Sequence, residues 1–91
     1  MSKQVFELSH PFEHKGATYT KFEARAPKVR DLRNFLKNVE RDSASAMEKA
    51  IADLCEVDEK IIAEMDLRDF APVKKWFEDF LKPMLSGSEE F

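Results

Sequence analysis

The chain has 91 residues, with 15 Lys and Arg against 18 Asp and Glu, a net charge of −3, one Cys and two Gly. This length suits one domain. A single cysteine excludes an intramolecular disulfide and any zinc site that needs two or more thiolates from this chain. No apolar run approaches the ~20 residues of a membrane span, and residues 1–10 lack the apolar stretch of a signal peptide. We therefore expect one cytosolic domain over residues 1–91, without membrane contact.

The predicted β-hairpin occupies about residues 4–25. Apolar side chains alternate with polar ones around Phe6 and again around Phe22, the period of two that is typical of a half-buried strand. Gly16 lies between the two runs and can supply the positive φ of a tight turn. Pro11 has no backbone N–H, so we expect the first strand to lie at a sheet edge or to bend there.

The helical part is predicted over about residues 28–84. Pro27 ends the hairpin and opens a helix, because proline fits the first helical turn. The apolar stripe of this helix has spacings of three and four residues and consists of Val29, Leu32, Leu36 and Val39. Ser45 and Glu48 have the form of a capping box, which predicts the start of a second helix.

Asp58 and Asp66 are predicted to cap two further helices. The apolar stripe of the last helix consists of Leu67, Phe70, Val73, Phe77, Phe80, Leu81 and Met84. Pro83 should close this helix, and residues 85–91 should form a frayed tail. The sequence thus predicts an α+β fold, in which an N-terminal antiparallel β-hairpin precedes three to four α-helices in a single small domain.

Residues with catalytic or metal-binding chemistry are few and scattered. His10 and His14 are four apart, but Pro11 disfavours the helix on which that spacing suits zinc, and no third ligand is close in sequence. Cys55 falls on the apolar face of its helix, which is typical of a small buried residue. Two glycines cannot make a glycine-rich phosphate loop. We predict no enzyme activity, no metal and no cofactor.

Two surface features are candidates for partner binding. One is a basic stripe, with spacings of three, four and four residues, turned away from the apolar face: Arg30, Arg33, Lys37 and Arg41. It is either a solvated helix face or a contact for an acidic partner or phosphate. The alternative function is therefore a small nucleic-acid-binding regulator, although the acidic net charge disfavours nucleic acid. The uneven charge of the chain also permits head-to-tail self-association, since residues 1–45 carry nine Lys and Arg against six Asp and Glu, and residues 46–91 carry six against twelve.

The second candidate feature is aromatic. Phe35 and Trp76 fall at the edges of their apolar stripes on a helical projection. Such residues either widen the core or serve as interface anchors, because aromatic side chains bury a large area on binding.

The order of residues along the chain resembles the tail assembly chaperones of contractile-tailed phages, the tail protein E family. The resemblance covers about residues 5–82. In the first half it rests on Leu8-x-x-Pro11, Gly16, Tyr19-Thr20-x-Phe22-x-x-Arg25-x-Pro27 and Asp31-Leu32. In the second half it rests on Ala50-Ile51-x-x-Leu54, Ile62, Met65-Asp66-Leu67-x-Asp69-Phe70, Val73, Phe77 and Phe80-Leu81. Two positions depart from the family: Lys28 stands where Thr is frequent, and Cys55-Glu56 where Thr-Gly is frequent.

The resemblance implies a non-catalytic protein of the host bacterial cytoplasm that is absent from the mature virion. Such chaperones bind the long tape measure protein and keep it soluble until tail tube subunits polymerise around it. A programmed frameshift often makes a longer form of the chaperone. The short form would then associate with itself as a homo-oligomer, and the extension would contact the tape measure. The resemblance assigns no binding residue, so the candidates for partner contact are Phe35, Trp76 and the four basic residues.

Overall fold

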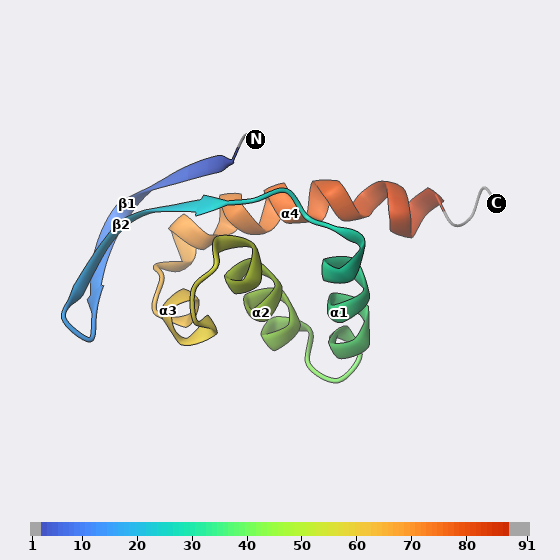
Figure 1. Cartoon of the computed structure of the whole chain (residues 1–91), viewed down its shortest axis with the longest axis horizontal. Coiled ribbons are helices and arrows are strands. Elements are labelled where there is room, and N and C mark those ends of the chain that lie inside the picture. The colour runs from blue at the N-terminus through green and yellow to red at the C-terminus, as the bar shows by residue number, and fades with distance from the viewer. Residues whose placement is uncertain (1–2, 88–91) are drawn as a thin grey trace.

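The computed structural model describes residues 3–87 and begins with a β-hairpin (Figure 1). Strands β1 (Gln4–His14) and β2 (Ala17–Ala24) pair antiparallel. Both residues of the two-residue turn have positive φ, 51° at Lys15 and 84° at Gly16. This conformation matches the twist of the strands, and glycine adopts it without steric cost. The predicted hairpin is confirmed.

Strand β1 is irregular in its middle. Glu7 lies opposite Lys21, but the next pair is Phe12 with Tyr19, so four residues of β1 face a single residue of β2. Pro11 lies within this bulge, as expected of a residue that cannot donate to the sheet. The predicted bend of the first strand is therefore confirmed.

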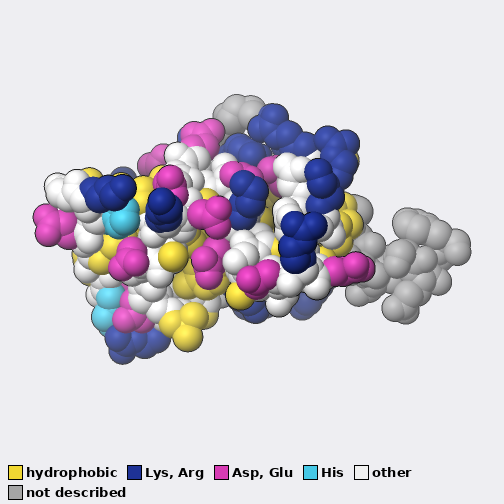
Figure 2. Space-filling model, turned by 90° about the horizontal axis from the view of Figure 1, so that it is seen from below, with side chains coloured by type: hydrophobic (Ala, Val, Ile, Leu, Met, Phe, Trp, Pro, Cys, Tyr) yellow, Lys and Arg dark blue, Asp and Glu magenta, His cyan; other side chains and the backbone are white. Residues whose placement is uncertain are grey.

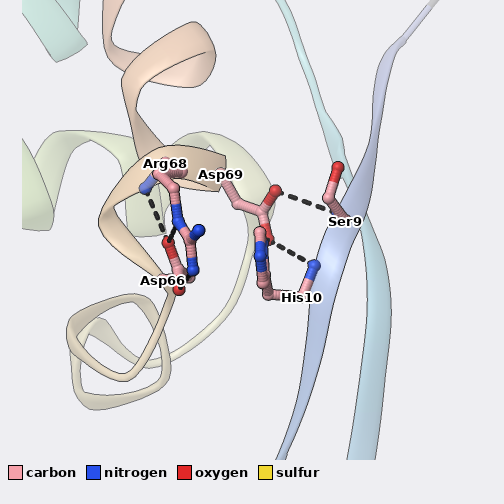
Figure 3. A network of polar contacts seen from close by, with 5 residues as sticks. All are labelled: Ser9, His10, Asp66, Arg68 and Asp69. Carbon is pink, nitrogen blue, oxygen red and sulfur yellow. Dashed lines mark hydrogen bonds and ion pairs between the residues drawn. The ribbon is translucent and has the colours of Figure 1, made fainter.

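Asp69 secures the bulge from another part of the chain (Figure 3). Its carboxylate accepts hydrogen bonds from the backbone N–H of Ser9 at 2.9 Å and of His10 at 2.8 Å. These two strand N–H groups are thus satisfied by a side chain. The His10 Nδ1 atom lies 3.5 Å from Asp69 Oδ2. A helix end and the bent strand are therefore joined by one carboxylate.

Four helices follow the hairpin: α1 (Val29–Val39), α2 (Ser43–Cys55), α3 (Glu59–Ala63) and α4 (Leu67–Gly87). Figure 1 shows α3, α2 and α1 in a row on one side of the long helix α4, with the hairpin running along α4. Helix α2 is central, since it contacts α1, α3, α4 and β2. This arrangement confirms the predicted α+β fold.

The core lies where α2, α4 and the hairpin meet. Its most completely buried large side chains are Ile51 and Leu54 of α2 and Val73 and Phe77 of α4. Phe35 of α1 packs edge-on against Phe77, with ring centroids 5.6 Å apart. Buried apolar residues from all six elements thus share one core.

Helix α1 is rotated relative to the prediction. Val29 is 79% exposed and Leu36 is 44% exposed, whereas Asp31 and Phe35 are buried. The Arg25 guanidinium donates to Asp31 through Nη1 at 2.8 Å and Nη2 at 3.0 Å. The predicted stripe is wrong at Val29 and Leu36, because this charge pair turns the Asp31 side of the helix inward.

The ends of the helices also differ from the prediction. Asp42, rather than Ser45, caps α2, since its side chain accepts from the Ser45 backbone N–H at 3.1 Å. Helix α4 continues through Pro83 to Gly87, beyond the predicted end at residue 84. Of the predicted tail 85–91, residues 85–87 are therefore helical, and residues 88–91 lie outside the described residues.

The two departures from the family pattern fall at helix ends. Lys28 is the N-cap of α1 and makes no side-chain cap hydrogen bond, at a position where a threonine hydroxyl could accept one. Glu56 is the C-cap of α2 and has φ 60°, a left-handed conformation that favours glycine. The residues that are frequent in the family would thus suit both positions better.

Candidate functional site

An apolar groove opens between the four helices. It has a volume of about 770 Å³. The residues that line it are Phe35, Val39, Ser43, Ala44, Met47, Glu48, Ile62, Ala63, Met65, Leu67, Phe70, Ala71, Lys74 and Glu78. Ten of these fourteen side chains are apolar, which is typical of a site that binds another apolar group.

Helix caps determine where the walls of the groove begin. Asp58 caps α3 by accepting from the Lys60 backbone N–H at 2.8 Å. Asp66 accepts hydrogen bonds from the Arg68 backbone N–H at 2.8 Å and from the Arg68 side chain (Figure 3). These bonds and the position of Asp66 at the start of α4 both favour the ionised carboxylate. These bonds hold the pKa of Asp66 well below its usual range, the Arg68 side chain being the largest cause. Leu67, the residue after Asp66, is the first residue of α4 and lines the groove.

Leu67 is the least buried large apolar residue of the groove. It is 76% exposed although it is hydrophobic and belongs to the first turn of a helix. Met47 and Met65 lie in the same lining, and methionine adapts its shape to different partners. The charged residues of the lining are Glu48, Lys74 and Glu78, of which Lys74 and Glu78 pair with each other at 3.0 Å. The groove therefore offers mainly apolar contact area.

The predicted basic stripe is a second surface, which we call the basic face and define as Arg30, Arg33 and Lys37 of α1 and Arg41 just after the end of this helix. All four side chains are exposed, as predicted. Within residues 3–87 none of them takes part in an ion pair. In Figure 2 Lys and Arg side chains gather on the right, on the side where α1 lies. The role of this face in binding stays a prediction.

The two aromatic candidates have different environments. Phe35 is 8% exposed and belongs to the core, which is the first of the two alternatives given for it, and it also lines the groove. Trp76 is half-buried, and its ring contacts Phe6 at 5.5 Å and Phe80 at 5.2 Å in edge-on geometry. It lies on the side of α4 that faces the hairpin. Contact of either residue with a partner stays a prediction.

The other residues with reactive or metal-binding chemistry lie apart within the described part of the chain. Burial raises the pKa of the Cys55 thiol to about 11, so the nucleophilic thiolate is scarce at neutral pH. In the described part of the chain, no three His, Cys, Asp or Glu side chains are grouped to hold a metal ion. No described helix is long and apolar enough to cross a membrane.

The sequence predicted the basic face, but it did not predict the groove. The lining comes from the ends of α1 and α2, from α3 and from the first turns of α4, segments separated by up to about forty residues. One signal was present, because Met65 and Leu67 are large apolar residues beside the predicted cap Asp66. It did not indicate which other segments would meet them.

A hairpin followed by four helices, with an open apolar groove between the helices, defines a small α+β protein. The sequence model of one family, described as phage tail assembly chaperone proteins, E, or 41 or 14, matches residues 5–82. The chain belongs to this phage tail assembly chaperone family. Comparison with curated proteins and comparison with solved structures gave no match.

Proposed function

We propose that this chain is a non-catalytic tail assembly chaperone that binds the tape measure protein and keeps it soluble while tail tube subunits assemble around it. It acts in the cytoplasm of the bacterial host and is left out of the mature virion. Family membership supports the assembly role. The observation that carries the binding role is the apolar groove between the four helices.

A tape measure protein is expected to be a long, largely helical chain, with apolar stripes that aggregate when exposed. An amphipathic helix binds by placing such a stripe in an apolar groove. The groove has suitable chemistry for this, with Phe, Met, Ile and Leu side chains in its lining and charged residues among them. The proposed contact is made by this chain itself, in addition to any contact made by the extension of a frameshifted longer form.

The test is co-expression of this chain, with and without any frameshift extension, beside the long helical protein encoded in the same genome. Affinity capture then measures binding, and the soluble fraction of the long protein measures chaperone activity. We expect the two proteins to be captured together and the long protein to become soluble. Failure of both readouts with the extension present would contradict the proposed function.

A matched pair of variants tests the groove. Leu67 and Val29 are each the first residue of a helix, and each is largely exposed, but only Leu67 lines the groove. Glutamate is well tolerated at a helix N-terminus, so Leu67→Glu and Val29→Glu should both fold. We expect Leu67→Glu to weaken capture roughly tenfold and Val29→Glu to leave it unchanged. Equal capture by both variants would place the contact elsewhere.

A further inference from the structure

The walls of the apolar groove are almost entirely helical. Thirteen of its fourteen lining residues belong to α1, α2, α3 or α4, and Met65 lies between α3 and α4. The backbone N–H and C=O groups of a helix bond within the helix. Asp42 and Asp66 also accept from N–H groups in the first turns of α2 and α4. An extended chain would therefore find few backbone partners in the groove, whereas a helical occupant brings its own backbone hydrogen bonds.

The groove also has a suitable shape for a helix. Its small, exposed lining residues are Ser43, Ala44, Ala63 and Ala71. Small side chains at a contact allow two helix axes to come closer together. On α4 the lining runs from Leu67 to Glu78, which corresponds to about 16 Å at the rise of a helix. The groove can therefore hold about three turns of a second helix.

Glu48 carries a charge in the lining that has no partner within residues 3–87. The charged residues of the lining are Glu48, Lys74 and Glu78, and Lys74 pairs with Glu78 at 3.0 Å. Glu48 is half-buried and takes part in no ion pair in that part of the chain. It does not cap α2 either, because Asp42 is the N-cap. An apolar helix that covered Glu48 would remove water from its carboxylate, which is costly unless a cation replaces the water.

The α3 side of the groove is acidic as well. Residues 56–66, which contain α3, carry five Asp and Glu against one Lys. Of these, Glu59 and Glu64 are exposed and make no ion pair in the described part of the chain. Such a potential favours a basic partner and disfavours an acidic one.

We propose that the groove binds a helix whose apolar stripe is bordered by a Lys or Arg, and that this cation pairs with Glu48. The inference rests on the proposed function, because it takes the helix to be a segment of the tape measure protein. Apolar contact is non-directional, so it does not distinguish one amphipathic segment from another. The pair with Glu48 supplies that distinction, since a matching charge fixes which segment binds and in which register.

A charge exchange between the two chains tests the pair. The probes are labelled peptides of about 20 residues that overlap along the tape measure protein of the same genome, a length sufficient for a helix. Fluorescence anisotropy measures their binding to the full chain, and circular dichroism measures the helix gained. We expect the tightest peptide to become helical. Replacing one of its basic residues with Glu should weaken binding to the wild type roughly tenfold, and Glu48→Lys should restore the binding of that altered peptide.

Glu13→Lys is the matched control. It changes the net charge by the same amount as Glu48→Lys, but Glu13 is exposed near the turn of the hairpin and is not part of the lining. We expect this variant to bind the unaltered peptide like the wild type, whereas Glu48→Lys should bind it roughly tenfold more weakly. Circular dichroism of each variant alone shows that it folds.

Two readouts separate this inference from the proposed function. If the wild type captures the co-expressed tape measure protein and Glu48→Lys captures it equally well, the pair is overturned and the proposed function stands. A tightest peptide without a basic residue, or one that binds without gaining helix, would also overturn the inference alone. If the wild type binds no peptide and captures no tape measure protein, both are contradicted.

Discussion

Arg25 and Asp31 form a two-pronged ion pair that joins the end of the hairpin to the first turn of α1. The guanidinium donates to both carboxylate oxygens, at 2.8 and 3.0 Å, and the Lys28 backbone N–H donates to Asp31 Oδ2 at 2.7 Å. The backbone N–H of Arg25 also donates to the carbonyl of Leu54 in α2, at 3.0 Å. The pair therefore connects β2, α1 and α2 at one point, which positions the helices that form the groove.

Removing the charge of Asp31 should destabilise the fold. Asp31→Asn leaves the largely buried Arg25 guanidinium without its counter-charge. We expect the free energy of unfolding to fall by about 3 kcal/mol, as measured by urea denaturation. Glu40→Gln is the control, because Glu40 is exposed at the end of the same helix, and its effect should be within about 0.5 kcal/mol. Equal effects of the two changes would show that the ion pair is not important for stability.

Stability should decrease at acidic pH. The Arg25 guanidinium holds the pKa of Asp31 below its ordinary value. Burial raises the pKa of Asp69, but the Ser9 and His10 backbone N–H groups outweigh it, so this pKa is also lowered. In the unfolded chain the pKa of Asp is about 3.9. As the pH falls, the unfolded chain therefore takes up protons at a higher pH than the folded chain does.

The stabilisation is complete above the unfolded pKa and is lost as the pH falls through the lower folded values. We expect the free energy of unfolding to decline from about pH 5 downward, as followed by urea denaturation at a series of pH values. Asp31→Asn should make this decline shallower, because one of the contributing carboxylates is absent. The same slope in both proteins would contradict the role given to Asp31.

Glycine at position 56 should stabilise the chain. Glu56 has φ 60°, where a Cβ atom costs roughly 1 kcal/mol relative to glycine. Its ion pair with Lys3, at 3.9 Å between exposed groups, contributes little. We expect Glu56→Gly to raise the free energy of unfolding by about 1 kcal/mol. Glu56→Ala keeps the Cβ atom and should give no gain, so an equal gain from alanine would rule out backbone strain as the cause.

Trp76 should contribute to stability through its two aromatic neighbours. Trp76→Ala removes the edge-on contacts with Phe6 and Phe80, and we expect a loss of about 2 kcal/mol in the free energy of unfolding. Phe80→Ala should cost less, because Phe80 is more exposed than Trp76. Unchanged stability together with weaker capture of the tape measure protein would instead assign Trp76 to partner binding.

The sequence by itself determined the features that depend on neighbouring residues. The hairpin follows from alternation around the turn at Gly16, and the starts of α3 and α4 follow from the caps Asp58 and Asp66. The same holds for the exposed basic face, because Arg30, Arg33 and Lys37 at helical spacing share one side of α1, and Arg41 follows just after the helix. Each of these patterns involves residues within a few turns of one another, so local geometry was enough to predict them.

Only the tertiary structure decided which side of α1 faces inward and where a groove opens. Asp31, which pairs with Arg25, and Phe35, which packs on Phe77, occupy the inward side of α1, whereas Val29 and Leu36 face outward. Asp69 reached across sixty positions to the bulge at Ser9, and the ends of four helices met to line the groove. These contacts join residues far apart in the sequence, and their partners are defined only once the chain has packed.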